Sequence, residues 1–255
     1  MKSLIEKISR KLFFTKASFQ VIFPHVPKCA GNAVIKSIQQ AAERSRINIS
    51  FDLFDGSACN LLASSKSLPW WEAAETVFAY KAISGNGNIL TGHAPFYEQT
   101  KKQLSVDKKI VTVLRNPVDR WISNYIYDCY KPQKLGGRFV EIGEYLSSGA
   151  AILGGNYYTV FFSNGNSEDI TSHDVEQSIR FLKKFDAVGC TEDMSRFNKL
   201  LGEICSMEIS SMEVNTTPKP GLSDEIKNDE SIITKIKKLC ENDIRVYEEV
   251  MLFWS

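Results

Sequence analysis

The chain has 255 residues, of which 43% are hydrophobic, 11% aromatic and 24% charged, as in a packed globular domain. This composition excludes collagen-like, low-complexity and disordered chains. With 31 Lys or Arg against 30 Asp or Glu, the formal net charge is +1, which argues against a dedicated nucleic-acid-binding protein.

The first 19 residues have the pattern of an amphipathic helix. Apolar residues at 4, 5, 8, 12 and 13 fall near helical spacing and alternate with basic residues. No apolar run approaches the roughly 20 residues of a membrane span, and no signal-peptide core is visible. We expect a soluble protein with no integral membrane segment, in which residues 1–19 form a helix and residues 20–255 one domain.

Six cysteines and three histidines are scattered along the chain. None of the cysteines forms a CxxC or other short metal-ligand spacing, so we expect no metal site. Cysteines at this density fit reduced thiols better than a disulfide framework. Together with the missing signal segment, this predicts a cytoplasmic location.

Strands alternate with helices from residue 20 onward. In chain order, the pattern predicts strand 20–26, helix 32–44, helix 69–83, strand 88–91, strand 109–114, helix 117–129, helix 173–184, strand 186–190, helix 192–204 and helix 230–253. The Gly- and Ser-rich region 131–170 is expected to form loops that face a substrate. This alternation indicates a single α/β domain with a mainly parallel central sheet flanked by helices. Ligands of such folds gather at the carboxyl ends of the strands.

The first strand-to-helix junction has the composition of an anion-binding loop. It reads Pro27-Lys-Cys-Ala-Gly-Asn32. Small residues let backbone N–H groups approach an anion, the helix N-terminus adds positive potential, and Lys28 adds a full charge. The spacing is not that of the Walker loop, because Lys28 precedes the glycine. A turn that merely joins a strand to a helix has a similar composition, so this junction alone does not distinguish an anion-binding loop from a simple connection.

The second junction follows the clearest strand of the chain. Arg115 ends that strand, Asn116 and Pro117 are suited to start a helix, and Ser123 lies two turns into it. A guanidinium at this place is suited to bidentate phosphate binding, with the Ser hydroxyl as a second donor. The alternative is an ion pair between Arg115 and Asp119.

Together, the two junctions resemble the carbohydrate-type sulfotransferases that use 3′-phosphoadenosine 5′-phosphosulfate (sulfotransferase family 2-like, with a P-loop-like fold). Residues 25–32 resemble their 5′-phosphosulfate loop, and residues 112–125 resemble their 3′-phosphate motif. Weaker similarities lie at 91–96, the family's His segment, at 185–192, its late strand, and at 215–219, its nucleotide-side loop. The family often has Thr or Ser where this chain has Cys29, Asn32 and Ala33.

The resemblance implies in-line transfer of a sulfuryl group to a hydroxyl of a small-molecule, carbohydrate or glycan-like acceptor, without a metal. Lys28 would stabilise the leaving phosphate and His93 would act as the base. The residues implied to bind the donor are Pro27, Lys28, Cys29, Ala30, Gly31, Asn32, Arg115, Ser123, Thr217 and Lys219.

Several alternatives stay open at this point. One alternative is a carboxylate that replaces or orients His93, the candidates being Glu98, Asp119 and Asp128. His25 is expected to be structural and His173 to be a surface residue. Four aromatic residues suit either sugar stacking or the core: Trp70, Trp71, Tyr157 and Tyr158. Two other functions compete, an ATP-dependent phosphotransferase and a non-catalytic nucleotide-binding relative.

Overall fold

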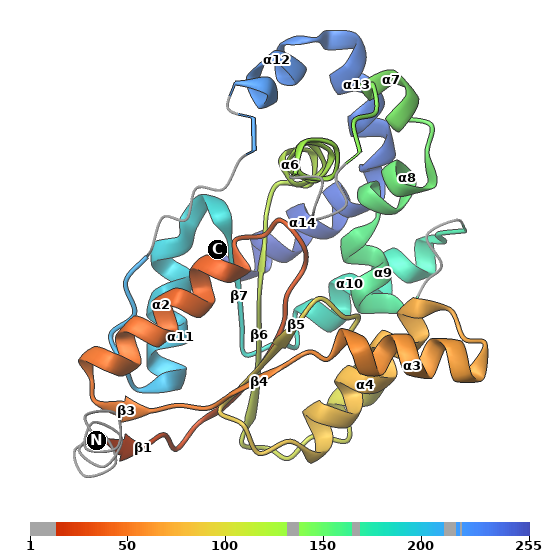
Figure 1. The fold of residues 1–255 in the computed structure, drawn as a ribbon. Helices are drawn as coiled ribbons and strands as arrows, with labels where there is room; N and C mark the ends of the chain where they lie inside the picture. The colour runs from red at the N-terminus through yellow and green to blue at the C-terminus, as the bar shows by residue number, and fades with distance from the viewer. Residues whose placement is uncertain (1–13, 132–137, 165–168, 212–217, 220) are drawn as a thin grey trace, which may run out of the picture.

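A five-stranded parallel sheet forms the centre of the protein (Figure 1). The computed structural model describes residues 14–131, 138–164, 169–211, 218–219 and 221–255. The sheet order is β4 (Phe51–Leu53), β5 (Ile89–Gly92), β2 (Gln20–Pro24), β6 (Lys108–Leu114) and β7 (Ala187–Cys190). Because every neighbouring pair is parallel, all five carboxyl ends meet at one edge. The expected α/β class with a parallel central sheet is confirmed.

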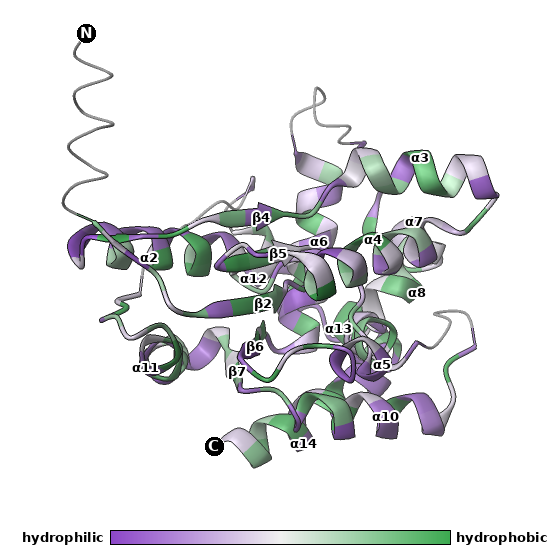
Figure 2. Cartoon of the chain, turned by 90° about the horizontal axis from the view of Figure 1, so that it is seen from below, coloured by the Kyte–Doolittle hydropathy of each residue, from purple (hydrophilic) through white to green (hydrophobic). Residues whose placement is uncertain are grey.

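Helices cover both faces of this sheet (Figure 1). On one face lie α2 (Gly31–Arg44) and α11 (Met194–Cys205), which pack on Val21 and Phe23 of β2. Ile22 points to the opposite face, as the two-residue period of a strand requires. That face is covered by α4 (Trp70–Ser84), α9 (Tyr157–Ser163), α10 (Ser172–Leu182) and α14 (Glu241–Trp254). Hydrophobic residues are interspersed with hydrophilic ones along α10 and α14 (Figure 2), and the apolar residues Val175, Ile179, Val246 and Val250 of these helices are buried on this face.

A third group of helices lies near the carboxyl edge of the sheet. It surrounds the buried ring of Trp121 and consists of α6 (Pro117–Tyr130), α7 (Ile142–Tyr145), α8 (Gly149–Gly155), α12 (Leu222–Asn228) and α13 (Glu230–Leu239). The expectation of loops over 131–170 is therefore wrong for its described part, where α7, α8 and α9 form. Gly155 explains one close contact there, because a Cβ would lie 2.1 Å from the carbonyl oxygen of Leu239.

Several elements differ from the sequence-based expectation. Residues 1–13 of the expected N-terminal helix lie outside the described residues, and Thr15–Lys16 form a strand, β1, that pairs with β3 (Ile47–Asn48). The expected helix 230–253 is two helices, α13 and α14, that meet at the buried Cys240. Additional helices are α3 (Gly56–Lys66), α5 (Glu98–Lys101) and the short 3₁₀ turn Thr191–Asp193.

Two further observations concern the cysteines and the hydropathy of the helices. All six cysteines are free, as expected for reduced thiols. In the described part of the chain, no helix has both the length and the hydropathy of a membrane span.

Candidate active site

A cavity of about 1100 Å³ opens at the carboxyl edge of the sheet. Residues that follow four adjacent strands line it: Lys28 after β2, His93 after β5, Arg115 after β6 and Thr191 after β7. The helix α6 contributes a further wall. The two junctions singled out in the sequence thus follow neighbouring strands and face one cavity.

The loop before α2 holds an uncapped helix N-terminus in the cavity. Lys28 and Ala30 adopt left-handed backbone conformations, with φ of 69° and 56°, that L-residues seldom take. Ala30 is the N-cap of α2 and makes no side-chain capping hydrogen bond. Within the described residues, the N–H groups of Gly31 and Asn32 have no hydrogen-bond partner. Free N–H groups at the positive end of a helix dipole form an anion-binding site.

Gly31 is required by the close approach of a histidine ring. A Cβ at this position would lie 1.9 Å from Nε2 of His25, so no larger residue fits without moving that ring. The His25 ring is buried and stacks on Phe23 with 5.4 Å between centroids. Burial, with a smaller contribution from His93, lowers the pKa of His25 to about 3, so this ring stays neutral at physiological pH.

Lys28 and Arg115 are cations that line the cavity. In the ranges that the structure describes, neither has a carboxylate oxygen within 4.0 Å. The Nζ of Lys28 lies 4.0 Å from the ring centroid of Tyr127. Burial lowers the pKa of Lys28, Asp128 acts to raise it and Arg115 acts to lower it. The expected alternative, an ion pair of Arg115 with Asp119, does not form.

The carboxylates of the cavity are already engaged by other groups. Asp119 pairs with Lys227 at 2.6 Å. Asp128 accepts a hydrogen bond from the amide of Asn124 at 2.9 Å. Glu192 accepts from the backbone N–H of Asn116 at 3.0 Å and from a tyrosine hydroxyl of α14 at 3.1 Å. Asp119 is thus paired with a cation, whereas Asp128 and Glu192 are hydrogen-bonded to neutral donors and keep their negative charge. The groups that suit an anionic ligand are therefore Lys28, Arg115 and the free N–H groups of the loop.

The second junction is fixed by a tyrosine from α9. The backbone N–H of Arg115 donates to the hydroxyl of Tyr158 at 2.9 Å, and this hydroxyl donates to the Arg115 carbonyl. The side chain of Asn116 accepts from two N–H groups at the start of α6 and caps it. Ser123 lies on the same helix and also lines the cavity. Arg115, at this held turn, and Ser123, within α6, thus line the same cavity.

His93 lies beside the Lys28 loop because β5 neighbours β2. Pro24 is in register with Gly92, the residue before His93. The Nδ1 of His93 lies 2.8 Å from the carbonyl oxygen of His25. A carbonyl only accepts, so Nδ1 carries the proton and Nε2 of the neutral ring has a free lone pair. The His93 ring is exposed in the cavity. Desolvation by the surrounding protein lowers the pKa of His93; the hydrogen bond to His25 acts to raise this pKa, and the charge of Lys28 acts to lower it.

Not every expected donor-binding residue reaches the cavity. Pro27, Ala30, Gly31 and Asn32 line it with Lys28. Cys29 does not: its thiol is fully buried, and its N–H donates to the Val26 carbonyl.

The nucleotide-side loop is only partly described. Thr217 lies outside the described residues. The Nζ of Lys219 lies 4.7 Å from the ring centroid of Tyr130. Pro218 lines the cavity, but Lys219 does not.

The other candidate residues also divide into those that line the cavity and those that do not. Asp119 and Asp128 line the cavity. Glu98, the first residue of α5, forms an ion pair with Lys184, and His173 is an exposed residue of α10. Of the four aromatic candidates, Tyr158 is core and Tyr157 lines the cavity. Among the described residues, no group of three or more His, Cys, Asp or Glu gathers to hold a metal ion.

Sequence reasoning missed part of the lining. Asn124 and Tyr127 follow Ser123 on α6, and helical spacing from Ser123 is a signal that would have found Tyr127 one turn on. Thr191, Glu192, Met194, Ser211 and Ser223 come from elements whose approach depends on the tertiary fold.

Comparison with known proteins gives one match. A family model described as a sulfotransferase domain matches residues 32–186, which is more than half of the chain. The matched range begins just after Lys28 and includes His93, Arg115 and Ser123. No curated protein matches the chain.

Proposed function

Since this chain belongs to the sulfotransferase family, we propose that it moves a sulfuryl group from 3′-phosphoadenosine 5′-phosphosulfate to a hydroxyl of a carbohydrate or glycan-like acceptor. The observation that carries this proposal is the pair of cations, Lys28 and Arg115, in one cavity above two adjacent strands. A doubly phosphorylated nucleoside has two separate anionic groups, and this cavity offers a separate cation for each.

In this proposal each junction binds one end of the donor. The free N–H groups of Gly31 and Asn32, with the Lys28 ammonium, hold the 5′-phosphosulfate. The guanidinium of Arg115 and the hydroxyl of Ser123 hold the 3′-phosphate, because a guanidinium matches two phosphate oxygens at once. Thr191 and Met194, which follow β7, lie on the side where the nucleoside would extend.

Strand order then sets the direction of transfer. The nucleotide-side residues follow β6 and β7, Lys28 follows the central β2, and His93 follows β5 on the other side. In-line displacement requires the acceptor to approach the sulfur opposite the leaving phosphate. The acceptor therefore enters from the β5 side, where His93 lies.

The chain's own residues supply the proton transfer and the charge stabilisation. The acceptor hydroxyl oxygen bonds to sulfur, the bond from sulfur to the 5′-phosphate oxygen breaks, and adenosine 3′,5′-bisphosphate leaves. The hydroxyl proton passes to Nε2 of His93, whose Nδ1–H is held by the His25 carbonyl. Lys28 stabilises the negative charge that grows on the leaving phosphate.

Two measurements test this function. In a thermal-shift assay, adenosine 3′,5′-bisphosphate should raise the melting temperature more than ATP with Mg²⁺, and Lys28→Ala should reduce the shift. A panel of sugars and other hydroxyl compounds, incubated with labelled donor, should yield a labelled sugar. A larger shift with ATP and Mg²⁺ would support a phosphotransferase instead. Nucleotide binding without transfer to any panel compound would indicate a non-catalytic relative.

A further inference from the structure

Aromatic side chains connect the cavity to the protein surface on the β5 side. Tyr157 lines the cavity, and its ring centroid lies 6.1 Å from that of Trp71. The ring of Trp71 lies 5.2 Å from that of Trp70, which is 38% exposed. An indole at the surface is thus linked to the cavity wall by two successive ring contacts.

A second route leads to the same indole from His93. Phe54 follows β4 and packs on Gly92, where a Cβ would lie 2.0 Å from the Cβ of Phe54. The Phe54 ring lies 6.1 Å from the ring of Trp70. Phe54 thus joins Trp70 to Gly92, the residue that directly precedes His93. Both routes lie on the side from which the acceptor enters.

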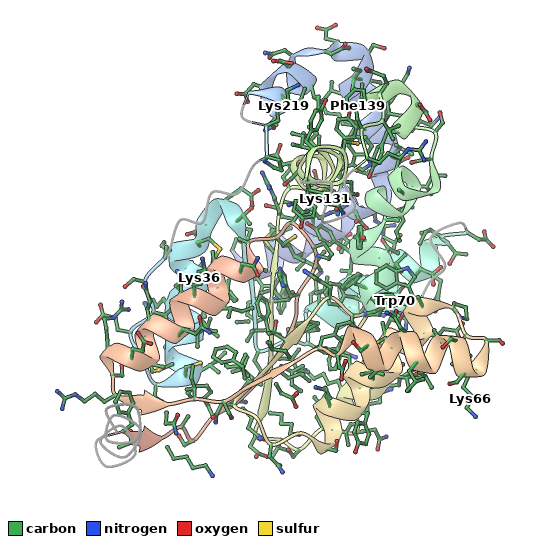
Figure 3. The ribbon with its side chains drawn as sticks, in the orientation of Figure 1. Lys36, Lys66, Trp70, Lys131, Phe139 and Lys219 are labelled. Atoms are coloured by element: carbon green, nitrogen blue, oxygen red, sulfur yellow. The ribbon has the colours of Figure 1, made fainter. Side chains whose placement is uncertain are left out.

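The orientation of Trp70 is held by a hydrogen bond. It is the first residue of α4, and its indole N–H donates to the side-chain oxygen of Asn60 on α3 at 3.0 Å. In Figure 3 it lies beside α9, where α4 begins. An exposed aromatic ring whose position is fixed before binding loses little conformational entropy when a ligand covers it.

We propose that Trp70 is a platform for the part of the acceptor that extends beyond the reacting sugar, so that the acceptor is a carbohydrate chain longer than one sugar. This inference rests on the proposed function. A sugar ring presents C–H groups on its faces and hydroxyl groups at its rim, which matches an aromatic surface with a polar edge.

The test compares acceptors of two lengths. Glucose, galactose and N-acetylglucosamine are each paired with a tetrasaccharide of the same sugar, and transfer from labelled donor is measured. For the sugar that is accepted, the wild-type protein should show the higher kcat/KM with the tetrasaccharide. Trp70→Ala should raise KM for the tetrasaccharide about tenfold, with kcat and the monosaccharide kinetics unchanged. Trp70→Phe, which keeps a ring, should retain most of the preference.

Tyr80→Ala is the matched control. Tyr80 lies on the same helix and is 70% exposed, and no aromatic contact joins it to the described part of the cavity. Its loss should change neither acceptor. An equal loss on both acceptors in Trp70→Ala, or no loss, would overturn the platform while leaving the sulfotransferase function intact. If the wild-type protein binds adenosine 3′,5′-bisphosphate but sulfates no sugar of either length, the carbohydrate acceptor and the platform both fail. A protein or lipid acceptor would then be indicated.

Discussion

The hydroxyl group of Tyr158 lies 3.6 Å from the Sγ of Cys29, although 129 positions separate the two residues in sequence. The same hydroxyl exchanges hydrogen bonds with the backbone N–H and carbonyl of Arg115. One buried side chain therefore joins the turn after β2 to the turn after β6. If these turns bind the two ends of one donor, Tyr158 sets the distance between them.

Removing this hydroxyl should loosen both turns. In Tyr158→Phe the half-buried backbone groups of Arg115 lose their partner, so we expect the free energy of unfolding to fall by about 1 kcal/mol. The dissociation constant of adenosine 3′,5′-bisphosphate should rise by roughly tenfold, which is about 1.4 kcal/mol. Chemical denaturation and calorimetric titration measure the two effects.

Tyr125→Phe is the control for this variant. The Tyr125 hydroxyl donates to the Val140 carbonyl, which belongs to neither turn. Its loss should lower stability without changing nucleotide affinity. Equal nucleotide affinity in Tyr158→Phe and the wild-type protein would show that the link between the turns is not needed for binding.

Gly31→Ala should displace the Lys28 loop. The new Cβ would overlap the His25 ring, so either the ring or the loop must move, at a cost of about 1–3 kcal/mol or more. We expect a lower melting temperature and weaker binding of adenosine 3′,5′-bisphosphate. Gly143→Ala on α7 is the matched change, because nothing lies within 4 Å of its Cβ. A Gly31→Ala protein with wild-type binding would contradict the account of this loop.

His93→Ala should separate chemistry from binding. Without a base, kcat should fall by about 10²- to 10⁴-fold, while the affinity for adenosine 3′,5′-bisphosphate stays within about twofold, because its phosphates contact other residues. Asp128→Asn is the comparison, since Asp128 also lines the cavity. If Asp128→Asn abolishes turnover and His93→Ala does not, the carboxylate is the base.

The rate should respond to pH in the direction set by His93. Desolvation by the surrounding protein lowers the pKa of His93 below the usual 6.5, so the ring is neutral at pH 7 and is protonated only in more acidic solution. A protonated ring cannot accept the hydroxyl proton. We expect kcat/KM to be constant around pH 7 and to fall as the pH is lowered. The fall should follow the uptake of a single proton, with a midpoint below pH 6.5. A limb centred above 6.5 would mean that another group titrates.

Local pattern was sufficient to predict much of the fold. The strand Lys108–Leu114 is an almost continuous apolar run because both of its faces are buried, and its sequence shows this directly. The edge strand Phe51–Leu53 has three residues and includes Asp52, which pairs with Lys81, so it carries no such pattern. The break at Cys240 has neither Gly nor Pro to mark it, and depends on how α13 and α14 pack.

The parts of the site that lie within one strand-to-helix junction could be predicted from the sequence. The parts that depend on packing between distant segments could not. Lys28 and Arg115 stand at strand ends, and residue type with position indicated an anion site. The burial of Cys29 depends on Tyr158, which comes from α9. The spacing of residues along the chain does not reveal that contact. The ring contacts of Trp70 likewise join segments that the sequence leaves apart.

The most direct test of the central claim asks whether Arg115 binds the 3′-phosphate. Calorimetric titration would compare adenosine 3′,5′-bisphosphate with adenosine 5′-phosphate on the wild-type protein and on Arg115→Ala. We expect Arg115→Ala to weaken the bisphosphate by at least roughly tenfold, the value of a charge-assisted hydrogen bond, and to leave the monophosphate unchanged. If Arg115→Ala weakens both ligands equally, or neither, the two turns do not share one donor in the way described here.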